Sequence, residues 1–273
     1  MKTIYYYQTF VGLDQVLQNI QNIDVINVSS LHFGKDTNGI KSIYLNDNKP
    51  YDTLFDELWL QTEKASVQGC KIILMMGGAG LAYQELFSDF QTYYSLLKKL
   101  IVDKQWICGI DLDIEESTKI EDVKMLINQL ISDFGEEFTI TMAPVSSSLQ
   151  HDGSSMAGFN YKQLYVSNEG KHIKWFNTQC YYSFSFETYE SIINNGYPPD
   201  KIVIGMESGQ FDEKTFPKAL NEIKNIKEKY PTFAGVFDWE YLNAPPDPND
   251  PSQWATRIKM IDYSIEYAKK RTV

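Results

Sequence analysis

Three carboxyl side chains stand at alternate positions of one short segment, as Asp111, Asp113 and Glu115. Residues two apart on a β-strand point to the same side, so one face of this segment would carry the acids and the other the Ile and Leu side chains between them. Neighbouring carboxylates shielded from water cannot all stay charged at low cost, so at least one pKa must rise. A carboxyl group with a raised pKa can act as a general acid near neutral pH.

Two other interpretations of the acidic segment are open. Oxygen ligands of this kind could hold Mg²⁺ or Ca²⁺, or the acids could lie on a solvated strand edge. The strand edge is the weaker alternative, because the apolar alternation requires one face to be buried. We expect no metal and no cofactor. The cysteines and histidines lack metal-ligand spacing, and the histidines are predicted to be ordinary surface or loop residues. These residues are Cys70, Cys108, Cys180, His32, His151 and His172.

Eight β-rich runs alternate with segments of helical periodicity along the chain. The runs cover residues 3–8, 24–29, 71–76, 106–113, 138–142, 174–181, 201–206 and 234–239. Helices are predicted for residues 51–68, 84–101, 120–134, 212–229 and 252–270. Strict alternation implies parallel strands with right-handed crossovers, and eight units in 273 residues favour a closed barrel. The predicted fold is therefore α/β, a single (β/α)8 TIM barrel over residues 1–273.

A doubly wound sheet with a phosphate-binding loop is the alternative fold. Residues 77–80 are Gly-Gly-Ala-Gly, which matches neither GxGxxG nor GxxxxGK[ST]. We instead expect Gly77 and Gly78 to let the chain turn sharply at the end of a strand.

The composition limits the possible partners. The net charge is −11, from 36 acidic and 25 basic residues, with no compensating Lys/Arg cluster, which excludes a nucleic-acid partner. The apolar runs are strand-sized, so no membrane span is expected. We expect a monomer. The first residues lack the features of a signal peptide, which leaves the location open between the cytoplasm and secretion with the signal removed.

The acidic segment resembles the DGxDxDxE signature of glycoside hydrolase family 18, the chitinases and endo-β-N-acetylglucosaminidases. Other segments resemble family motifs in the expected order, so that the resemblance covers nearly the whole chain. Residues 71–78 resemble the SxGG strand, 141–144 the fifth strand, 179–181 the sixth-strand Gln-x-Tyr of plant-type (class III) chitinases, 196–205 the approach to the seventh strand, and 235–239 the eighth.

The resemblance implies a role for each residue of the motif. Glu115 would protonate the glycosidic oxygen and later activate water. The nucleophile would be the 2-acetamido carbonyl of the substrate, as in substrate-assisted glycosidases. Asp113 would accept a hydrogen bond from the acetamido N–H, and Asp111 would hold or share the proton of Asp113. Tyr181 would donate to the acetamido oxygen.

Further residues are expected to bind substrate. Trp239 would form an apolar floor under the reacting sugar. Gln179 is either a structural support or a substrate contact. The remaining expected contacts are Met142, Gly77, Gly78 and Tyr182.

The chain departs from the family pattern at four positions. Cys108 replaces the first Asp of the signature, Met75 a Ser, Val145 a Glu or Gln, and Tyr182 an Asn or Asp. None of these changes removes the acids or Tyr181. Few residues separate Met206 from the next predicted helix, so there is no room for the small α+β insertion of some family members. An open groove and internal cleavage are expected, with residues 32–48 and 146–158 as groove-lining loops.

The expected function is retaining, endo-acting hydrolysis of β-1,4-linked N-acetylglucosamine polymers, and the expected partner is an oligo- or polysaccharide of this sugar. Chitin and the chitobiose core of N-glycans both remain possible substrates, with Gln-x-Tyr favouring chitin. An alternative of another class is a non-catalytic lectin on the same barrel. The presence of Glu115 argues against a lectin.

Overall fold

The strands and helices follow one another along the whole chain. The computed structural model describes residues 1–271, with side chains for all of these except residues 266 and 268–271. The strands are β1 Lys2–Tyr7, β2 Val25–Lys35, β3 Lys41–Leu45, β4 Lys71–Gly77, β5 Ile107–Asp113, β6 Thr139–Met142, β7 Ile173–Gln179, β8 Ile202–Glu207 and β9 Gly235–Trp239. The helices are α1 Asp14–Gln18, α2 Asp56–Val67, α3 Ala82–Ser88, α4 Phe90–Asp103, α5 Ile120–Phe134, α6 Ser146–Gln150, α7 Tyr161–Tyr165, α8 Phe186–Asn194, α9 Phe216–Lys229 and α10 Ser252–Arg271.

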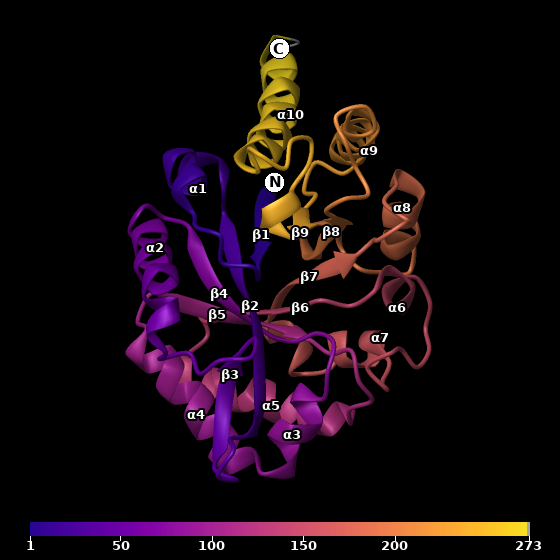
Figure 1. Cartoon of the computed structure of the whole chain (residues 1–273). Coiled ribbons are helices and arrows are strands. Elements are labelled where there is room, and N and C mark those ends of the chain that lie inside the picture. Colours follow the sequence, from indigo (N-terminus) through magenta and orange to yellow (C-terminus); the bar gives the residue numbers. More distant parts are fainter. Residues whose placement is uncertain (272–273) are drawn as a thin grey trace.

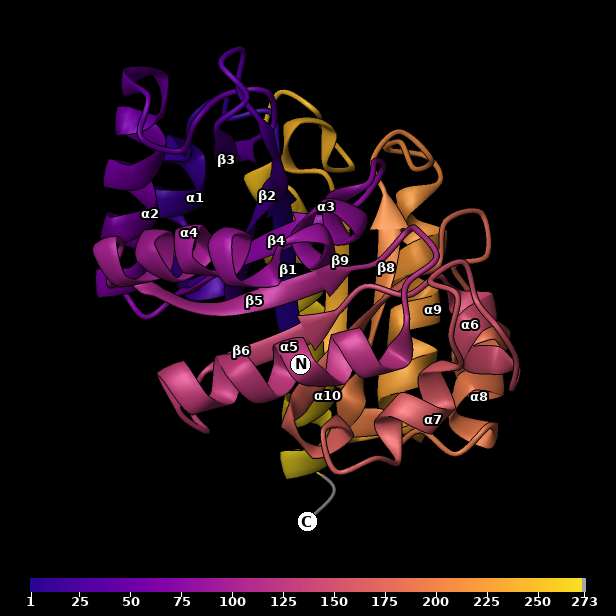
Figure 2. The same ribbon diagram turned by 90° about the horizontal axis from the view of Figure 1, so that it is seen from below.

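Eight of these strands form a closed parallel barrel. Their order is β1-β9-β8-β7-β6-β5-β4-β2, and β1 pairs with both β9 and β2, which closes the sheet. The helices lie outside the strands (Figure 1), with α2 and α4 on one side and α8 and α9 on the opposite side (Figure 2). The predicted (β/α)8 barrel is confirmed. Only a short segment joins β8 to α9, so the expected absence of an inserted domain there is also confirmed.

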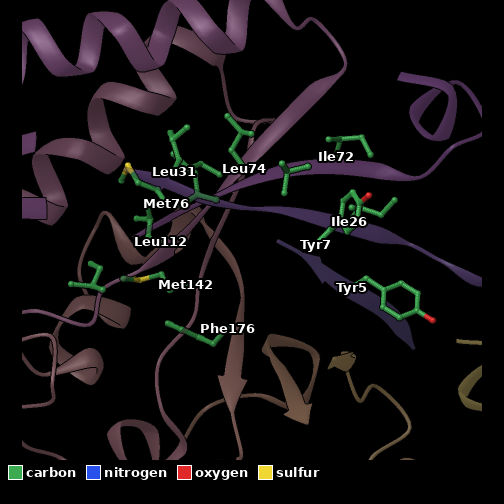
Figure 3. Packing of buried hydrophobic residues seen from close by; sticks show 14 of the residues in the cluster. Tyr5, Tyr7, Ile26, Leu31, Ile72, Leu74, Met76, Leu112, Met142 and Phe176 are labelled. Atoms are coloured by element: carbon green, nitrogen blue, oxygen red, sulfur yellow. The ribbon is translucent and has the colours of Figure 1, made fainter. Parts of the chain in front are cut away.

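Alternation along each strand separates two apolar layers. Ile110 and Leu112 of β5 belong to the larger cluster between the strands and the helices, part of which is drawn in Figure 3. A smaller cluster fills the barrel interior, with Tyr6, Met75 and Phe237 among its members. Asp111 and Asp113 point to this interior, because they alternate with the outward-facing residues.

Three predicted segments differ from the structure. Residues 146–158, expected to be a groove-lining loop, begin with helix α6. Residues 32–48 do not form a loop, because β2 extends to Lys35 and pairs with β3 in an antiparallel hairpin. The predicted helix 84–101 is two helices, α3 and α4, that meet at Asp89. The side chain of Asp89 accepts a hydrogen bond from the backbone N–H of Thr92, and so caps the start of α4. Within residues 1–271, no helix combines the length and apolar character needed to cross a bilayer.

Candidate active site

The acidic row ends in a cavity at the carboxyl end of the barrel strands. Asp111 is completely buried, Asp113 is 5% exposed and Glu115, beyond the end of β5, is half-buried. The cavity has a volume of about 320 Å³. It is lined by Gln8, Ser30, His32, Gly77, Gly78, Ala79, Asp113, Glu115, Gln179, Tyr181 and Trp239. The barrel therefore brings residues from β1, β2, β4, β5, β7 and β9 around two of the three acids.

Asp111 is surrounded by hydrogen-bond donors. Its carboxylate accepts from the Tyr6 hydroxyl at 2.6 Å, the Thr141 hydroxyl at 2.5 Å and the Asn177 amide at 3.0 Å. Burial raises the pKa of Asp111, and these three hydrogen bonds oppose that rise. Three donors stabilise a carboxylate, so the deepest acid of the row has the partners needed to hold a negative charge.

Asp113 has a less favourable environment for charge. Burial, then Glu115, then Asp111 raise the pKa of Asp113 well above its ordinary value, and only a hydrogen bond from Gln179 opposes this. The expectation that the row contains at least one raised carboxyl pKa is therefore met at Asp111 and more strongly at Asp113. Asp113 is the member of this pair that keeps a proton more easily.

The Gln179 amide joins the two outer acids. Its Nε2 atom lies 2.9 Å from the Ala143 carbonyl oxygen, 3.1 Å from Asp113 Oδ1 and 3.2 Å from Glu115 Oε1. An amide nitrogen has two protons, so one can be donated to Ala143 while the other faces both carboxyl groups. Gln179 therefore supports the carboxyl row and also lines the cavity.

Two glycines allow β4 to approach β5 closely. Gly77 has φ +101°, and a Cβ there would lie 2.1 Å from the backbone oxygen of Asp113. Gly78 has φ +82°, and its N–H donates to the same oxygen at 2.9 Å. Both positions need glycine for its positive φ, and at Gly77 a side chain would also collide with β5. The sharp turn expected at these residues is present.

Met75 lies inside the barrel close to Asp113. A Cβ on Gly78 would lie 3.1 Å from Met75 Cε and 3.5 Å from Asp113 Oδ2, so the thioether and the carboxyl group border the same space. The Ser30 hydroxyl donates to Met75 Sδ at 3.1 Å. The position at which the resemblance expects a serine therefore contributes an apolar group to the surroundings of Asp113.

Tyr181 and Trp239 form the aromatic part of the cavity. Burial raises the pKa of Tyr181 well above its ordinary value, so its hydroxyl stays protonated and can donate. Among the described residues, none forms a hydrogen bond with that hydroxyl. Trp239 lies at the end of β9, with its ring 5.5 Å from the ring of Tyr6. The cavity thus offers a free phenol donor and an indole ring.

Two expected substrate contacts lie elsewhere. Met142 is completely buried and belongs to the cluster between the barrel and the helices, so its expected contact with sugar is wrong in this structure. Its neighbour Thr141 points inward to Asp111, and alternation turns Met142 outward. Tyr182 does not line the cavity; its side chain is 88% exposed, and its backbone N–H donates to Gln210.

The histidines differ from one another. His151 is exposed, as expected. His172 lies in the connection between α7 and β7, as expected for a loop residue, but its side chain is buried at 7% exposure and forms a 2.9 Å contact with Glu136. His32, also predicted to be an ordinary surface or loop residue, lies on β2 and lines the cavity. The histidine in the cavity had no partner spacing in the sequence that could have marked it.

The described residues do not form a metal-binding arrangement. Among residues 1–271, no group of His, Cys, Asp and Glu side chains is arranged to hold a metal ion. The partners of Asp111 are hydroxyl and amide donors, which suit a carboxylate rather than a cation.

Known structures identify the family. No family model and no curated protein matches the chain. A fungal endo-β-N-acetylglucosaminidase from glycosyl hydrolase family 18 is 30% identical, with a TM-score of 0.83 over 96% of this chain and 98% of the other. The chain belongs to glycosyl hydrolase family 18. This family 18 protein is therefore a glycosidase on a TIM barrel.

Two chitinases are also similar to this family 18 enzyme. One, from Aspergillus fumigatus, is 29% identical, with a TM-score of 0.80 over 95% of this chain and 98% of the other. A family 18 chitinase from Pseudoalteromonas aurantia is 20% identical, with a TM-score of 0.74 over 96% and 100% of the two chains. The second of these similarities concerns the fold alone.

Proposed function

We propose that this enzyme hydrolyses β-1,4-linked N-acetylglucosamine polymers of the chitin type, cutting within the chain with retention of configuration. We further propose that residues 1–273 form one catalytic domain that acts as a monomer. The observation that carries the proposal is the position of Glu115 in the 320 Å³ cavity, joined by the Gln179 amide to a buried Asp113.

Two acids of the cavity have distinct roles in the proposed reaction. Glu115 protonates the leaving glycosidic oxygen, and the carbonyl oxygen of the substrate's own 2-acetamido group attacks the anomeric carbon. Asp113 accepts a hydrogen bond from the acetamido N–H and stabilises the positive charge that develops there. Glu115, now ionised, then takes a proton from the water that opens the cyclic intermediate.

Three further groups support this reaction. Asp111, with its three donors, provides a fixed negative charge behind Asp113. The free hydroxyl of Tyr181 donates to the acetamido oxygen, and the Trp239 ring packs against the apolar face of the sugar. Gly77 and Gly78 leave room beside Asp113 for the acetamido group. Tyr182 is proposed as an additional contact at the exposed rim.

An open groove supports internal cleavage. A second cavity of about 950 Å³ adjoins the first, and both are lined by Gln8, His32 and Ala79. Sugar units beyond the one in the catalytic cavity can occupy this groove. The names of the two most identical structures described above, a chitinase and an endo-β-N-acetylglucosaminidase, agree with a substrate that contains N-acetylglucosamine.

The proposal is tested with wild type, Glu115→Gln and a matched Glu116→Gln variant on chitohexaose and a high-mannose glycopeptide. Glu116 is the adjacent acid, but its carboxylate accepts from the backbone N–H groups of Tyr83 and Gln84, outside the cavity. Loss of the general acid should lower kcat by about 10²- to 10⁴-fold, whereas Glu116→Gln should retain activity.

Analysis of the products distinguishes between the two candidate substrates, chitin and the N-glycan core. Cleavage of chitohexaose well above that of the glycopeptide is expected, and the reverse preference would overturn the chitin assignment. Equal rates for wild type and Glu115→Gln would refute the role of Glu115. A thiazoline analogue of N-acetylglucosamine should inhibit competitively, and a lack of inhibition would contradict substrate assistance.

A further inference from the structure

The catalytic cavity and the neighbouring groove meet at a narrow set of residues. Gln8, His32 and Ala79 line both spaces, and they come from the ends of β1, β2 and β4. A chain that extends from the catalytic cavity into the groove therefore passes beside these three side chains. Ala79 offers only a methyl group, so polar recognition at this junction falls to Gln8 and His32.

His32 has unused hydrogen-bonding capacity at this point. Its ring is half-buried, and within residues 1–271 no protein group forms a hydrogen bond with either ring nitrogen. Burial lowers the pKa of His32, while Asp47 acts in the opposite direction. A neutral imidazole has one N–H donor and one nitrogen acceptor, which matches a sugar hydroxyl or acetamido group that can both donate and accept.

The junction is held in place before any ligand binds. The side chain of Asn46 donates to the Gln8 carbonyl oxygen at 3.0 Å and accepts from the Ser30 N–H at 3.1 Å, so that β1, β2 and the hairpin are tied together. His32 itself is in register with Tyr44 of β3. Gly80, with φ +130°, leaves open space beside the ring, since even a Cβ there would lie 3.7 Å from Cε1 and Nδ1.

We propose that His32 is a specificity-determining residue, which hydrogen-bonds the sugar unit at the junction and so selects N-acetylglucosamine chains long enough to enter the groove. This inference rests on the proposed function, because the ligand at the junction is the continuation of the chain cut at Glu115. His32 contacts the substrate away from the reacting bond. Its effect should therefore fall on binding of long substrates and not on the chemical step.

The experiment compares wild type, His32→Ala, His32→Gln and His151→Ala on chitohexaose and on the shortest chitooligosaccharide that wild type cuts. His151 is an exposed histidine outside both cavities and is the matched control. For His32→Ala we expect KM for chitohexaose to rise about tenfold, equivalent to one hydrogen bond, with kcat within about twofold. The rise should be smaller for the short substrate, and His32→Gln should recover part of the affinity.

A binding measurement makes the outcome independent of turnover. In the Glu115→Gln background, calorimetric titration with chitohexaose should show the same loss of affinity for His32→Ala. An unchanged KM and affinity in a His32→Ala protein with the wild-type melting temperature would overturn the role of His32. So would an equal fall in kcat on both substrates, which would mean that His32 acts through the carboxyl row. If wild type cuts neither oligosaccharide, the proposed function itself fails.

Discussion

The carboxyl groups of the row are distinguished by their donors. Asp111 receives three hydrogen bonds, whereas Asp113 receives one, from Gln179, which it shares with Glu115. Burial raises the pKa of both aspartates, and Glu115 and Asp111 raise the pKa of Asp113 further, so Asp111 with its three donors holds a charge at lower cost. The two aspartates of one strand thus differ in how strongly their surroundings favour the charged form.

Replacement of Gln179 by Leu should test the bridge between Asp113 and Glu115. The variant removes the shared proton donor at similar volume, so the acids lose their common anchor, and kcat should fall by up to about 10²-fold. The acidic limb of the pH–activity profile should also move to higher pH, because Asp113 acts as a carboxylate and loses the hydrogen bond that opposes the rise in its pKa. Gln163→Leu, at an exposed position, is the control. An unchanged kcat and profile would contradict the bridging role.

Asp238 is a buried acid outside the carboxyl row. The Ser208 hydroxyl oxygen lies 2.6 Å from Asp238 Oδ2 and 2.6 Å from the carbonyl oxygen of Glu240. Ser208 has one proton, and a carbonyl group cannot donate, so both contacts are hydrogen bonds only if Asp238 donates its own proton to Ser208. Burial raises the pKa of Asp238 well above its ordinary value, which agrees with a protonated carboxyl group.

This protonation predicts a pH-dependent stability. An acid whose pKa is higher in the folded than in the unfolded state stabilises the fold at low pH, and this stabilisation is lost as pH rises through the folded pKa. Asp238→Asn can still donate to Ser208 and cannot ionise, so it should remove up to about 1.4 kcal/mol per pH unit from the slope. Urea unfolding between pH 5 and 8 should show the variant more stable than wild type at pH 8. Parallel slopes would disprove a protonated Asp238.

At the scale of elements, the barrel strands were predictable because their signal is local. Each strand is a short β-rich run between helical segments, and alternation in β5 alone placed Asp111 and Asp113 inside. The hairpin strand β3 has no such signal, since its five residues include two polar ones and gain their order by pairing with β2. Asp89 is a residue type that often caps a helix, so a break there could have been predicted. The apolar periodicity continues across Asp89, however, and the sequence therefore predicted one helix.

The sequence predicted those site residues that belong to a family motif. It did not predict a residue that reaches the site only through the fold. Glu115, Tyr181 and Trp239 come from separate strands and meet in one cavity. The expected contact of Met142 with sugar could have been rejected from alternation, since Met142 follows Thr141, whose side chain points inward. The place of His32 could not be predicted, because it depends on how β2 extends beyond the barrel by pairing with β3, a strand that has no signal of its own in the sequence.

Gly205 of β8 has no space for a side chain, because the Phe237 ring of β9 packs against it. A Cβ on Gly205 would lie 1.9 Å from the Phe237 ring, which packs between Tyr6 at 4.9 Å and Tyr181 at 6.4 Å. Gly205→Ala should therefore destabilise the fold by about 1–3 kcal/mol and displace Tyr181, with loss of activity. The control Gly153→Ala, where nothing lies within 4 Å, should leave melting temperature and rate unchanged or slightly raised. Full activity of Gly205→Ala would contradict the packing argument.

At the scale of the whole molecule, the first strand and the last helix both contribute to the closed barrel. β1 pairs with β9, and α10 packs against β1. The Tyr5 hydroxyl donates to the Pro251 carbonyl oxygen at 2.6 Å, and the Trp254 ring lies 4.9 Å from the ring of Tyr5. The first strand and the last helix therefore stabilise the barrel together.

Trp254 should be among the most sensitive positions for global stability. Its side chain is completely buried, and its indole N–H lies 3.1 Å from Met206 Sδ. Trp254→Ala should lower the free energy of unfolding by about 3–5 kcal/mol. Met260→Ala on the same helix is the control, since Met260 is 63% exposed and should change stability little. Similar chemical-denaturation midpoints for both variants would show that α10 is not part of the cooperative unit.

The β2–β3 hairpin has a practical consequence for engineering. β3 pairs only with β2 among the described strands, and residues of the hairpin line the groove, whereas the carboxyl row lies on β5 and just beyond its end. Grafting a longer or shorter hairpin between Ser30 and Asn46, with the Asn46 anchor kept, would alter the length of sugar chain accepted without changing the catalytic groups. A library of such grafts offers a route to enzymes with chosen product sizes.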